Sequence, residues 1–188
     1  VWLPMALRCG LISQLDELAV ATALAEIAKD GVERGVNLSP ASLQDIQFVH
    51  RLHARLLAAP EAARHLWLEV AEILTVAALD NFAMVRELCK QVKALGVRVG
   101  LEHAGERLTR IEFLFEAGLD YVKLDASVVH GVASDSARRA FVAGSVTMLH
   151  SLGLAVYAEG VHDLEDLQAL WTCGFHGVTG PAVRFNAP

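Results

Sequence analysis

Val99-Gly100-Leu101-Glu102-His103-Ala104-Gly105 has the pattern of a buried strand that runs into two titratable side chains and a glycine turn. The apolar residues from Val97 to Leu101 predict the strand, and Gly105 predicts the turn after it. Chargeable groups at the carboxyl end of a buried strand are costly unless they face a cleft or solvent. The stretch therefore indicates either a ligand site at Glu102 and His103 or a solvated loop.

The same order of elements recurs along the chain: an amphipathic helix, a glycine and a short β-branched strand. Glycine adopts the left-handed conformation of a helix C-cap at little cost, so we expect a helix to end at each of these glycines. They are Gly35, Gly96, Gly118, Gly153 and Gly174. The expected strands cover residues 36–38, 65–70, 97–101, 121–124, 154–158 and the region of Val178. Their spacing of roughly 20 to 35 residues is typical of parallel βα units.

Successive βα units form either an open doubly wound sheet or most of a β/α barrel. No strand is followed by a glycine-rich phosphate loop, which disfavours the nucleotide-binding open sheet. In a barrel the carboxyl ends of the strands meet at one mouth, so polar residues at these ends would form one site. Those residues are Asn37, Glu69, Glu72, Glu102, His103, Lys123, Asp125 and Glu159. We therefore expect an α/β fold, a TIM-like (β/α)8 barrel that lacks its amino-terminal part.

Composition and charge narrow the class of protein. Apolar residues make up 54% of the 188 residues, and no apolar run reaches the roughly 18 residues needed to cross a bilayer. The net charge of -6 and the lack of a Lys/Arg cluster argue against duplex nucleic acid as a partner. The chain starts at Val1 without a Met or a basic segment. We interpret residues 1–188 as a single domain, an amino-terminally truncated fragment of a longer chain.

Five motifs occur in the order and spacing of a known family. They are Asn37-Leu38-Ser39, Leu68-Glu69-Val70-Ala71-Glu72, Glu102-His103-Ala104-Gly105, Tyr121-Val122-Lys123-Leu124-Asp125 and Ala158-Glu159-Gly160-Val161. With them, essentially the whole chain resembles the EAL domain family. The resemblance implies a modified (β/α)8 barrel of EAL type that binds cyclic di-GMP. In intact members, it also implies hydrolysis to linear pGpG with two Mg2+ or Mn2+ ions.

The resemblance also implies roles for single residues. Asn37 and Glu69 match metal-ligand positions, and Glu159 matches the glutamate of the late Glu-Gly-Val motif. Lys123 matches the lysine that contacts the attacking water, and we expect it to pair with Glu69, Glu102 or Glu159 because an unpaired ammonium in an apolar strand is costly. The positions that hold the loops of the site in shape are Glu72 and Asp125.

The departures from the family pattern affect positions that the family uses for catalysis. The metal-bridging Asp-Asp pair is replaced by Glu102 and His103, and the Phe-Gly-Thr-Gly loop after it by residues 104–107. The second glutamate of the Glu-Gly-Val-Glu motif is replaced by His162, and the late glutamine by Thr179. The Glu-Ala-Leu motif that names the family lies upstream of Val1.

These departures weaken a two-metal mechanism. Two divalent ions a few ångström apart repel each other, and two-metal sites rely on several carboxylates, some of them bridging. His103 removes one bridging carboxylate, and the longer Glu102 displaces the other by about an ångström, a shift that can cost on the order of a hundredfold in rate. We therefore expect no working catalytic residue, with Lys123 and Glu159 vestigial. The vestigial metal set is Asn37, Glu69, Glu102 and His103.

Ligand binding does not require the metals, because side chains recognise guanine edges, ribose and phosphate oxygens. Asp16 and Glu159 are the candidates for guanine contacts, and Asn37 and Lys123 for the phosphate side. Degenerate members of the family serve as receptors in this way, and residues 100–105 are similar to the LapD-like membrane receptors. The first hypothesis is thus a non-catalytic cyclic-di-GMP receptor module of bacterial second-messenger signalling that needs no cofactor for binding.

Two alternatives stay open. A residual phosphodiesterase would use Mg2+ or Mn2+ to give pGpG; if one metal is held by Asn37, Glu69, Glu102 and His103, such mixed ligands suit Zn2+, Mn2+ or Fe2+ better than Mg2+. A domain that has lost its ligand would serve as a protein-interaction or dimerisation platform. The expected context is a cytoplasmic domain, and of an inner-membrane protein if the LapD-like comparison holds. The expected partners are a second copy and upstream GGDEF-type or membrane-linked signalling domains.

Overall fold

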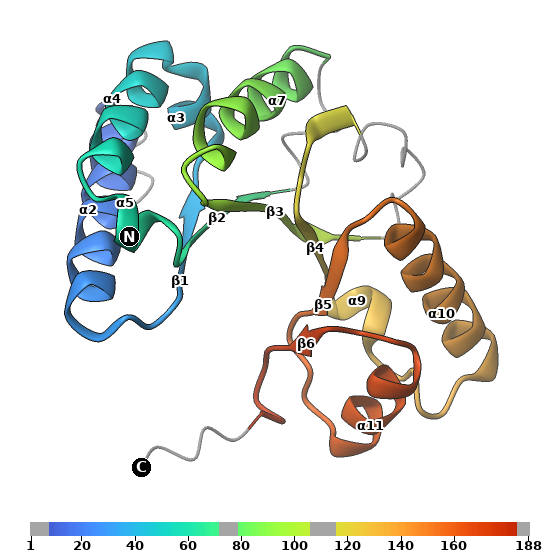
Figure 1. The fold of residues 1–188 in the computed structure, drawn as a ribbon. Coiled ribbons are helices and arrows are strands. Elements are labelled where there is room, and N and C mark those ends of the chain that lie inside the picture. The colour runs from blue at the N-terminus through green and yellow to red at the C-terminus, as the bar shows by residue number, and fades with distance from the viewer. Residues whose placement is uncertain (1–7, 72–78, 106–115, 184–188) are drawn as a thin grey trace. The chain divides into compact units, whose positions relative to one another are not determined.

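The computed structural model describes residues 8–71, 79–105 and 116–183, in which helices and strands alternate along the chain (Figure 1). Six strands are hydrogen-bonded in chain order, from β1 to β6. The pairs β1 with β2, β4 with β5 and β5 with β6 are parallel. The chain forms two compact units, of which the first comprises residues 1–100 and 116–119 and the second residues 101–115 and 120–188. The predicted series of parallel βα units is confirmed.

The first unit holds two complete strands and the helices around them. The strands are β1 (Arg34–Leu38) and β2 (Leu66–Ala71), and the helices are α2 (Ile12–Asp30), α3 (Pro40–Gln44), α4 (Ile46–Leu57), α5 (Pro60–Ala63) and α7 (Leu79–Lys93). Helix α4 buries Phe48, Val49, Leu52 and Leu56. This spacing places the apolar side chains on one side of the helix, where they pack into the core of the unit.

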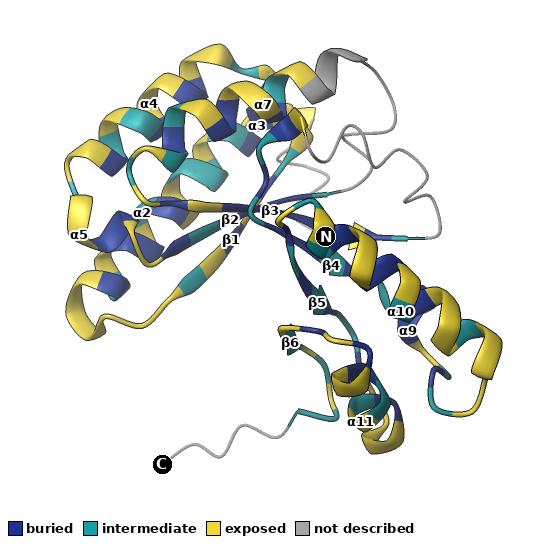
Figure 2. Cartoon of the chain, turned by 45° about the vertical axis from the view of Figure 1, so that its right-hand side comes forward, coloured by how far each residue is buried: buried dark blue, intermediate teal, exposed yellow. Residues whose placement is uncertain are grey.

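The second unit begins within β3 (Arg98–Ala104), whose first residues belong to the first unit. It continues with β4 (Tyr121–Leu124), α9 (Ala126–Val129), α10 (Ser136–Ser151), β5 (Ala155–Ala158), α11 (Leu164–Thr172) and β6 (Gly177–Val178). The interiors of β4 and β5 are almost free of solvent, since Val122, Leu124 and Val156 are fully buried. Figure 2 shows the contrast between these strands and α10, which has exposed residues along much of its length.

The structure corrects two boundaries. Helix α2 ends at Gly31, with φ of 70° and its N–H donated to Ile27 O, whereas Gly35, predicted to end this helix, lies within β1. The strand predicted to end at Leu101 continues to Ala104, so Glu102 and His103 belong to β3 and do not follow it. No helix within the described ranges is long and apolar enough to cross a membrane.

Candidate functional site

Three neighbouring strands of the second unit end side by side. Asp125 follows β4 directly and donates its backbone N–H to Ala104 O at the end of β3, at 2.9 Å. Glu159 follows β5 directly and donates its backbone N–H to Leu124 O at the end of β4, also at 2.9 Å. The hydrogen-bonding pattern of the sheet thus continues one residue beyond β4 and β5. It fixes the backbone positions of Asp125 and Glu159. Polar residues from three separate parts of the sequence meet at this edge, as the barrel prediction requires.

His103 has an uncommon backbone conformation. Its φ of 54° lies in the left-handed region, which costs a residue with a Cβ on the order of 1–3 kcal/mol. Neighbouring residues of a regular strand point to opposite faces of the sheet. Here, however, His103 Nε2 lies 3.9 Å from Glu102 Oε1. The left-handed turn at His103 therefore brings two consecutive side chains towards the same place.

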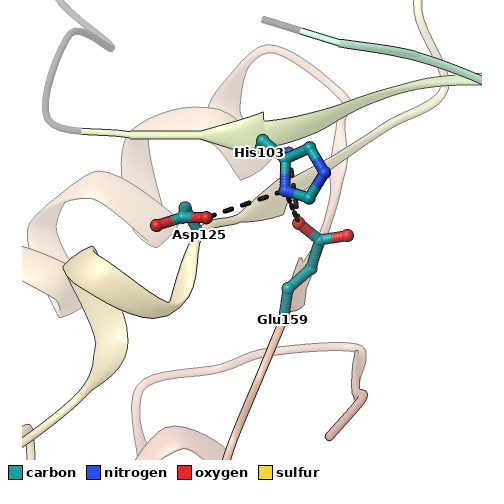
Figure 3. Close-up of side chains that lie close together, drawn as sticks. All are labelled: His103, Asp125 and Glu159. Atoms are coloured by element: carbon teal, nitrogen blue, oxygen red, sulfur yellow. Dashed lines mark hydrogen bonds and ion pairs between the residues drawn. The ribbon is translucent and has the colours of Figure 1, made fainter. Parts of the chain in front are cut away.

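The His103 imidazole lies between two carboxylates, as Figure 3 shows. Nδ1 is 3.1 Å from Glu159 Oε2 and 3.6 Å from Asp125 Oδ2. The backbone N–H of His103 donates to the same Glu159 oxygen at 3.1 Å. We call His103, Asp125 and Glu159 the His103 cluster. The side chain of His103 is 60% exposed, so the cluster is open to solvent on the side of the ring.

Lys123 and Glu102 flank this cluster. Lys123 lies on β4 opposite Tyr157 of β5, and its Nζ is 3.9 Å from Glu159 Oε1. The prediction that Lys123 pairs with one of three glutamates is confirmed for Glu159. Glu102 is buried, with 7% of its surface exposed. Glu159 thus contacts a cationic side chain through one oxygen and the imidazole through the other.

Asp125 has two oxygens with different surroundings. Oδ1 accepts a hydrogen bond from Ser127 N at 2.9 Å and caps α9, while Oδ2 faces His103. Hydrogen bonds from the Ser127 side chain and backbone lower the pKa of Asp125, and the nearby His103 adds to this effect. Asp125 is therefore ionised at neutral pH and is held in place by the start of α9.

Gly160 fixes the turn that follows Glu159. Its φ is 63°, and a Cβ at this position would lie 2.9 Å from Ala126 Cβ on α9. Because any larger residue would push this turn away from α9, the close approach of the two segments requires glycine. Glu159 is consequently anchored from both sides, by the ladder before it and by this contact after it.

The other predicted site residues lie in the first unit or outside the described ranges. Asn37 is exposed on β1 and pairs in register with the buried Glu69 on β2. Asp16 Oδ2 accepts hydrogen bonds from Ser39 N and Ser42 Oγ, both at 2.7 Å, and so holds the start of α3. The residues Asp16 and Asn37 both line an open hollow beside α2 and β1. Glu72 lies outside the described residues. The ligand and metal roles of these residues stay predictions.

Sequence reasoning missed a second histidine and carboxylate group, which we call the His130 cluster: His130, Asp163 and Asp166. His130 Nδ1 lies 3.7 Å from Asp166 Oδ2 and 3.9 Å from Asp163 Oδ2. The buried Asp166 carboxylate accepts hydrogen bonds from the backbone N–H groups of Gly131 and Ala133 at 2.7 and 2.9 Å. The spacing of two aspartates three residues apart marks one side of a helix, but no local pattern shows that residues 131–133 pack against it.

Comparison with known proteins gives the family. The sequence model described as "EAL domain" matches residues 2–184. The chain belongs to the EAL domain family. The cyclic di-GMP phosphodiesterase PdeA of Borreliella burgdorferi is 24% identical over 168 residues, which cover 87% of this chain and 25% of PdeA. The chain thus spans about a quarter of the length of this relative.

Solved structures agree with this assignment at the level of the fold. The FimX EAL domain of Pseudomonas aeruginosa, in a structure bound to c-di-GMP, has a TM-score of 0.86 at 21% identity, covering 97% of this chain and 74% of the FimX chain. The S helix-GGDEF-EAL segment of Vibrio cholerae LapD, also bound to c-di-GMP, has a TM-score of 0.81 at 19% identity, covering 95% of this chain and 43% of that one. The predicted EAL-type fold is confirmed.

At His103 the second unit departs from the ligand set that a pair of Mg2+ or Mn2+ ions needs. Mg2+ prefers oxygen ligands in octahedral geometry, and two-metal sites need carboxylates that bridge both ions. At the position where the family carries the second aspartate, His103 presents a ring nitrogen to Asp125 and Glu159. One ring nitrogen binds one ion only, so His103 supplies no bridging ligand, while Glu102 keeps a carboxylate beside it. The described groups that could hold a single ion are the His103 cluster and the His130 cluster, since in each the three ligand atoms lie within 4.8 Å of one another.

Proposed function

We propose that this EAL domain is a non-catalytic receptor module that binds cyclic di-GMP in bacterial second-messenger signalling. One observation carries the proposal: the imidazole of His103 contacts Glu159 and Asp125 at the position where hydrolysis would need a metal-bridging carboxylate. Without that bridge, the two-ion hydrolysis expected of intact family members has no counterpart in these residues.

The remaining polar groups suit recognition of a nucleotide. Lys123 supplies a positive charge for phosphate, and Glu159 supplies carboxylate oxygens that accept hydrogen bonds from a guanine edge. Both side chains are mostly buried, at 16% and 14% exposure, and are held by neighbouring strands, so their positions are prearranged. FimX and LapD are proteins of this fold with solved c-di-GMP complexes. Asp16 and Asn37 are proposed as further contacts, for guanine and phosphate respectively.

The proposal includes a cellular context. We propose a cytoplasmic domain that needs no metal to bind its ligand and is joined to upstream signalling domains of GGDEF type or to a membrane-linked segment. A second copy of the chain is a further proposed partner. The solved LapD chain, in which GGDEF and EAL domains are joined, supports this arrangement by analogy.

Binding and turnover are tested in one set of samples. The full chain is titrated calorimetrically with cyclic di-GMP in excess EDTA, and the ligand is then chromatographed after incubation with Mg2+ or Mn2+. We expect micromolar or tighter binding in EDTA and recovery of intact dinucleotide under all conditions. Absence of binding in EDTA would contradict the proposal, and absence of binding in EDTA and in both metals would leave a protein-interaction platform.

A residual phosphodiesterase is the second candidate. It is favoured by the persistence of three carboxylates around His103, those of Glu102, Asp125 and Glu159, and by the phosphodiesterase activity named for PdeA. Appearance of pGpG with Mg2+ or Mn2+ would establish this candidate and exclude the non-catalytic one. If pGpG appears, His103→Ala tests whether His103 takes part in the reaction. His130→Ala is the matched control for that variant, because it removes an imidazole beside two carboxylates elsewhere in the same unit.

A further inference from the structure

We propose that His150 and His176 form a pH-sensitive contact that holds β6 against β5 in the second unit and releases it in acid. His150 lies in the last turn of α10, and His176 directly precedes β6. The two imidazole rings meet edge to face, with their centroids 4.8 Å apart. The inference goes beyond the proposed function, because neither ring belongs to the His103 cluster and the contact does not involve cyclic di-GMP.

His176 binds both polar backbone groups of one residue in β5. Its backbone N–H donates to Val156 O at 2.8 Å, and its Nδ1 accepts the Val156 N–H at 3.1 Å. The ring therefore takes the place of a backbone carbonyl just before β5 and β6 begin to pair, at Tyr157 and Gly177. An acceptor at Nδ1 requires a neutral ring with its proton on Nε2.

Protonation of the His176 ring removes this hydrogen bond. A cationic imidazole carries a proton on both nitrogens, so Nδ1 would then direct a donor at the N–H of Val156. Val156 is fully buried, and a buried N–H without an acceptor destabilises the state that contains it. His176 itself is exposed, so protons reach its ring from solvent. We therefore expect acid to break the contact at His176 first.

His150 resists protonation while the two rings are in contact. Its Nε2 is buried and has no hydrogen-bond partner among the described residues, so a cationic ring would place a buried N–H there without an acceptor. Burial, and after it the neighbouring His176, lower the pKa of His150. Two cationic rings at this separation would also repel each other. The contact is therefore stable only while both rings are neutral.

The groups around the pair do not offset a positive charge on it. Among the described residues, no carboxylate lies within ion-pair distance of the ring of His150 or His176. Tyr157 of β5 faces His176, with ring centroids 6.2 Å apart, and tyrosine is uncharged near neutral pH. Burial raises the pKa of Cys173 at the end of α11, so this thiol is neutral as well. Arg139 of α10, the charged group that acts on Cys173, is a cation.

The sign of the pH dependence follows from His150. A histidine whose pKa is lowered by folding contributes stability that is complete above its unfolded pKa and is lost as the pH falls through its folded pKa. Because unfolded histidine titrates near pH 6.5, the loss begins below about that value. We therefore expect the pairing of β5 with β6 to be stable at about pH 7.5 and weakened at about pH 5.5.

Hydrogen exchange of the full chain, followed by NMR at about pH 7.5 and about pH 5.5, tests the inference. We expect the protection of the Val156 amide, corrected for the intrinsic exchange rate, to fall at least about tenfold in acid. His176→Asn should keep this protection constant within about twofold, because the asparagine side-chain oxygen accepts the same hydrogen bond but does not titrate. His162→Asn is the matched control, since it removes an exposed histidine of the same unit and should leave the wild-type pH dependence intact.

Two further measurements keep the test informative if His176→Asn fails to fold. The 15N shifts of the wild-type rings should show neutral His176 with its proton on Nε2. His150→Phe keeps an aromatic ring without a charge, so its stability in urea should depend less on pH than that of the wild type. A pH-independent protection of Val156 in the wild type, an equal loss in His176→Asn, or a proton on Nδ1 of neutral His176 would overturn the inference.

Discussion

The His103 and His130 clusters contain the same kinds of side chain, one imidazole and two carboxylates, yet their oxygens have different partners. In the His130 cluster the buried carboxylate of Asp166 binds the backbone of residues 131 and 133. In the His103 cluster Glu159 Oε1 faces Lys123, while Oε2 faces the His103 ring and also accepts the His103 backbone N–H. Both oxygens of Asp166 accept backbone N–H groups and so stabilise a loop, whereas each oxygen of Glu159 also contacts a chargeable side chain, which a ligand can replace. The two clusters thus have the same residue types, and what distinguishes the structural cluster from the functional one is the set of groups that contact their carboxylate oxygens.

Glu159→Lys should have the largest effect. It places a second ammonium beside Lys123 and reverses the charge that faces His103, and like charges brought together at a binding site cost several kcal/mol. We expect cyclic di-GMP binding in EDTA to fall at least about a thousandfold. Calorimetric titration of a variant with a normal circular dichroism spectrum checks this, and unchanged affinity would remove Glu159 from the proposed site.

Asp166→Ala should have the next largest effect, but on stability. It removes the acceptor of two backbone N–H groups, and we expect the free energy of unfolding to fall by about 3 kcal/mol. Denaturation in urea measures this loss, with Asp163→Ala as the exposed control. A loss below about 1 kcal/mol would show that the His130 cluster does not hold the loop at residues 131–133.

Ser127→Ala should have a smaller, pH-dependent effect. It removes the largest cause of the lowered pKa of Asp125, which should then rise towards the ordinary value near 4. A carboxyl whose pKa is lowered by folding contributes stability that is complete above its unfolded pKa and is lost as the pH falls through its folded pKa. The variant should thus be less stable than wild type by about 1 kcal/mol at pH 7.

The two proteins should become equally stable in acid, once Asp125 is protonated in both folded states. Unfolding curves measured between pH 7 and acid give the stability difference, and NMR titration of the Asp125 carboxyl gives the pKa. A difference independent of pH would assign the effect of Ser127 to packing.

His130→Ala should have the smallest effect. Exposed ion pairs contribute little to stability, so we expect the Tm to change by less than about 2 °C and cyclic di-GMP binding to stay the same. Thermal unfolding and calorimetry check the two quantities. A clear loss of binding would mean that the difference between the two clusters has been assigned wrongly.

Much of the fold was predictable because it depends on periodic patterns. Apolar runs, five of which follow a glycine, correctly placed the six strands, and the spacing correctly indicated parallel βα units. The C-cap prediction failed at Gly35 because Gly31, only four residues earlier, ends α2, and the sequence does not distinguish a capping glycine from one inside a strand.

The sequence predicted which residues form the site but not how their side chains are arranged. The sequence indicated that Glu102, His103, Lys123, Asp125 and Glu159 lie at strand ends, and the structure places them within one unit. The left-handed φ of His103 could not be foreseen, because histidine adopts that conformation more often than most residues but still only in a small minority of cases. This single dihedral turns the ring towards Asp125 and Glu159, and tertiary contacts rather than local sequence determine it.

The central claim is that the domain binds cyclic di-GMP without a metal. Its most direct test is the Kd for cyclic di-GMP, measured by calorimetry with the full chain in EDTA and again in Mn2+. We expect micromolar or tighter binding in both, with Kd values that differ by less than about tenfold, because side chains and not a metal pair hold the ligand. Binding seen only in Mn2+, with none in EDTA, would contradict it.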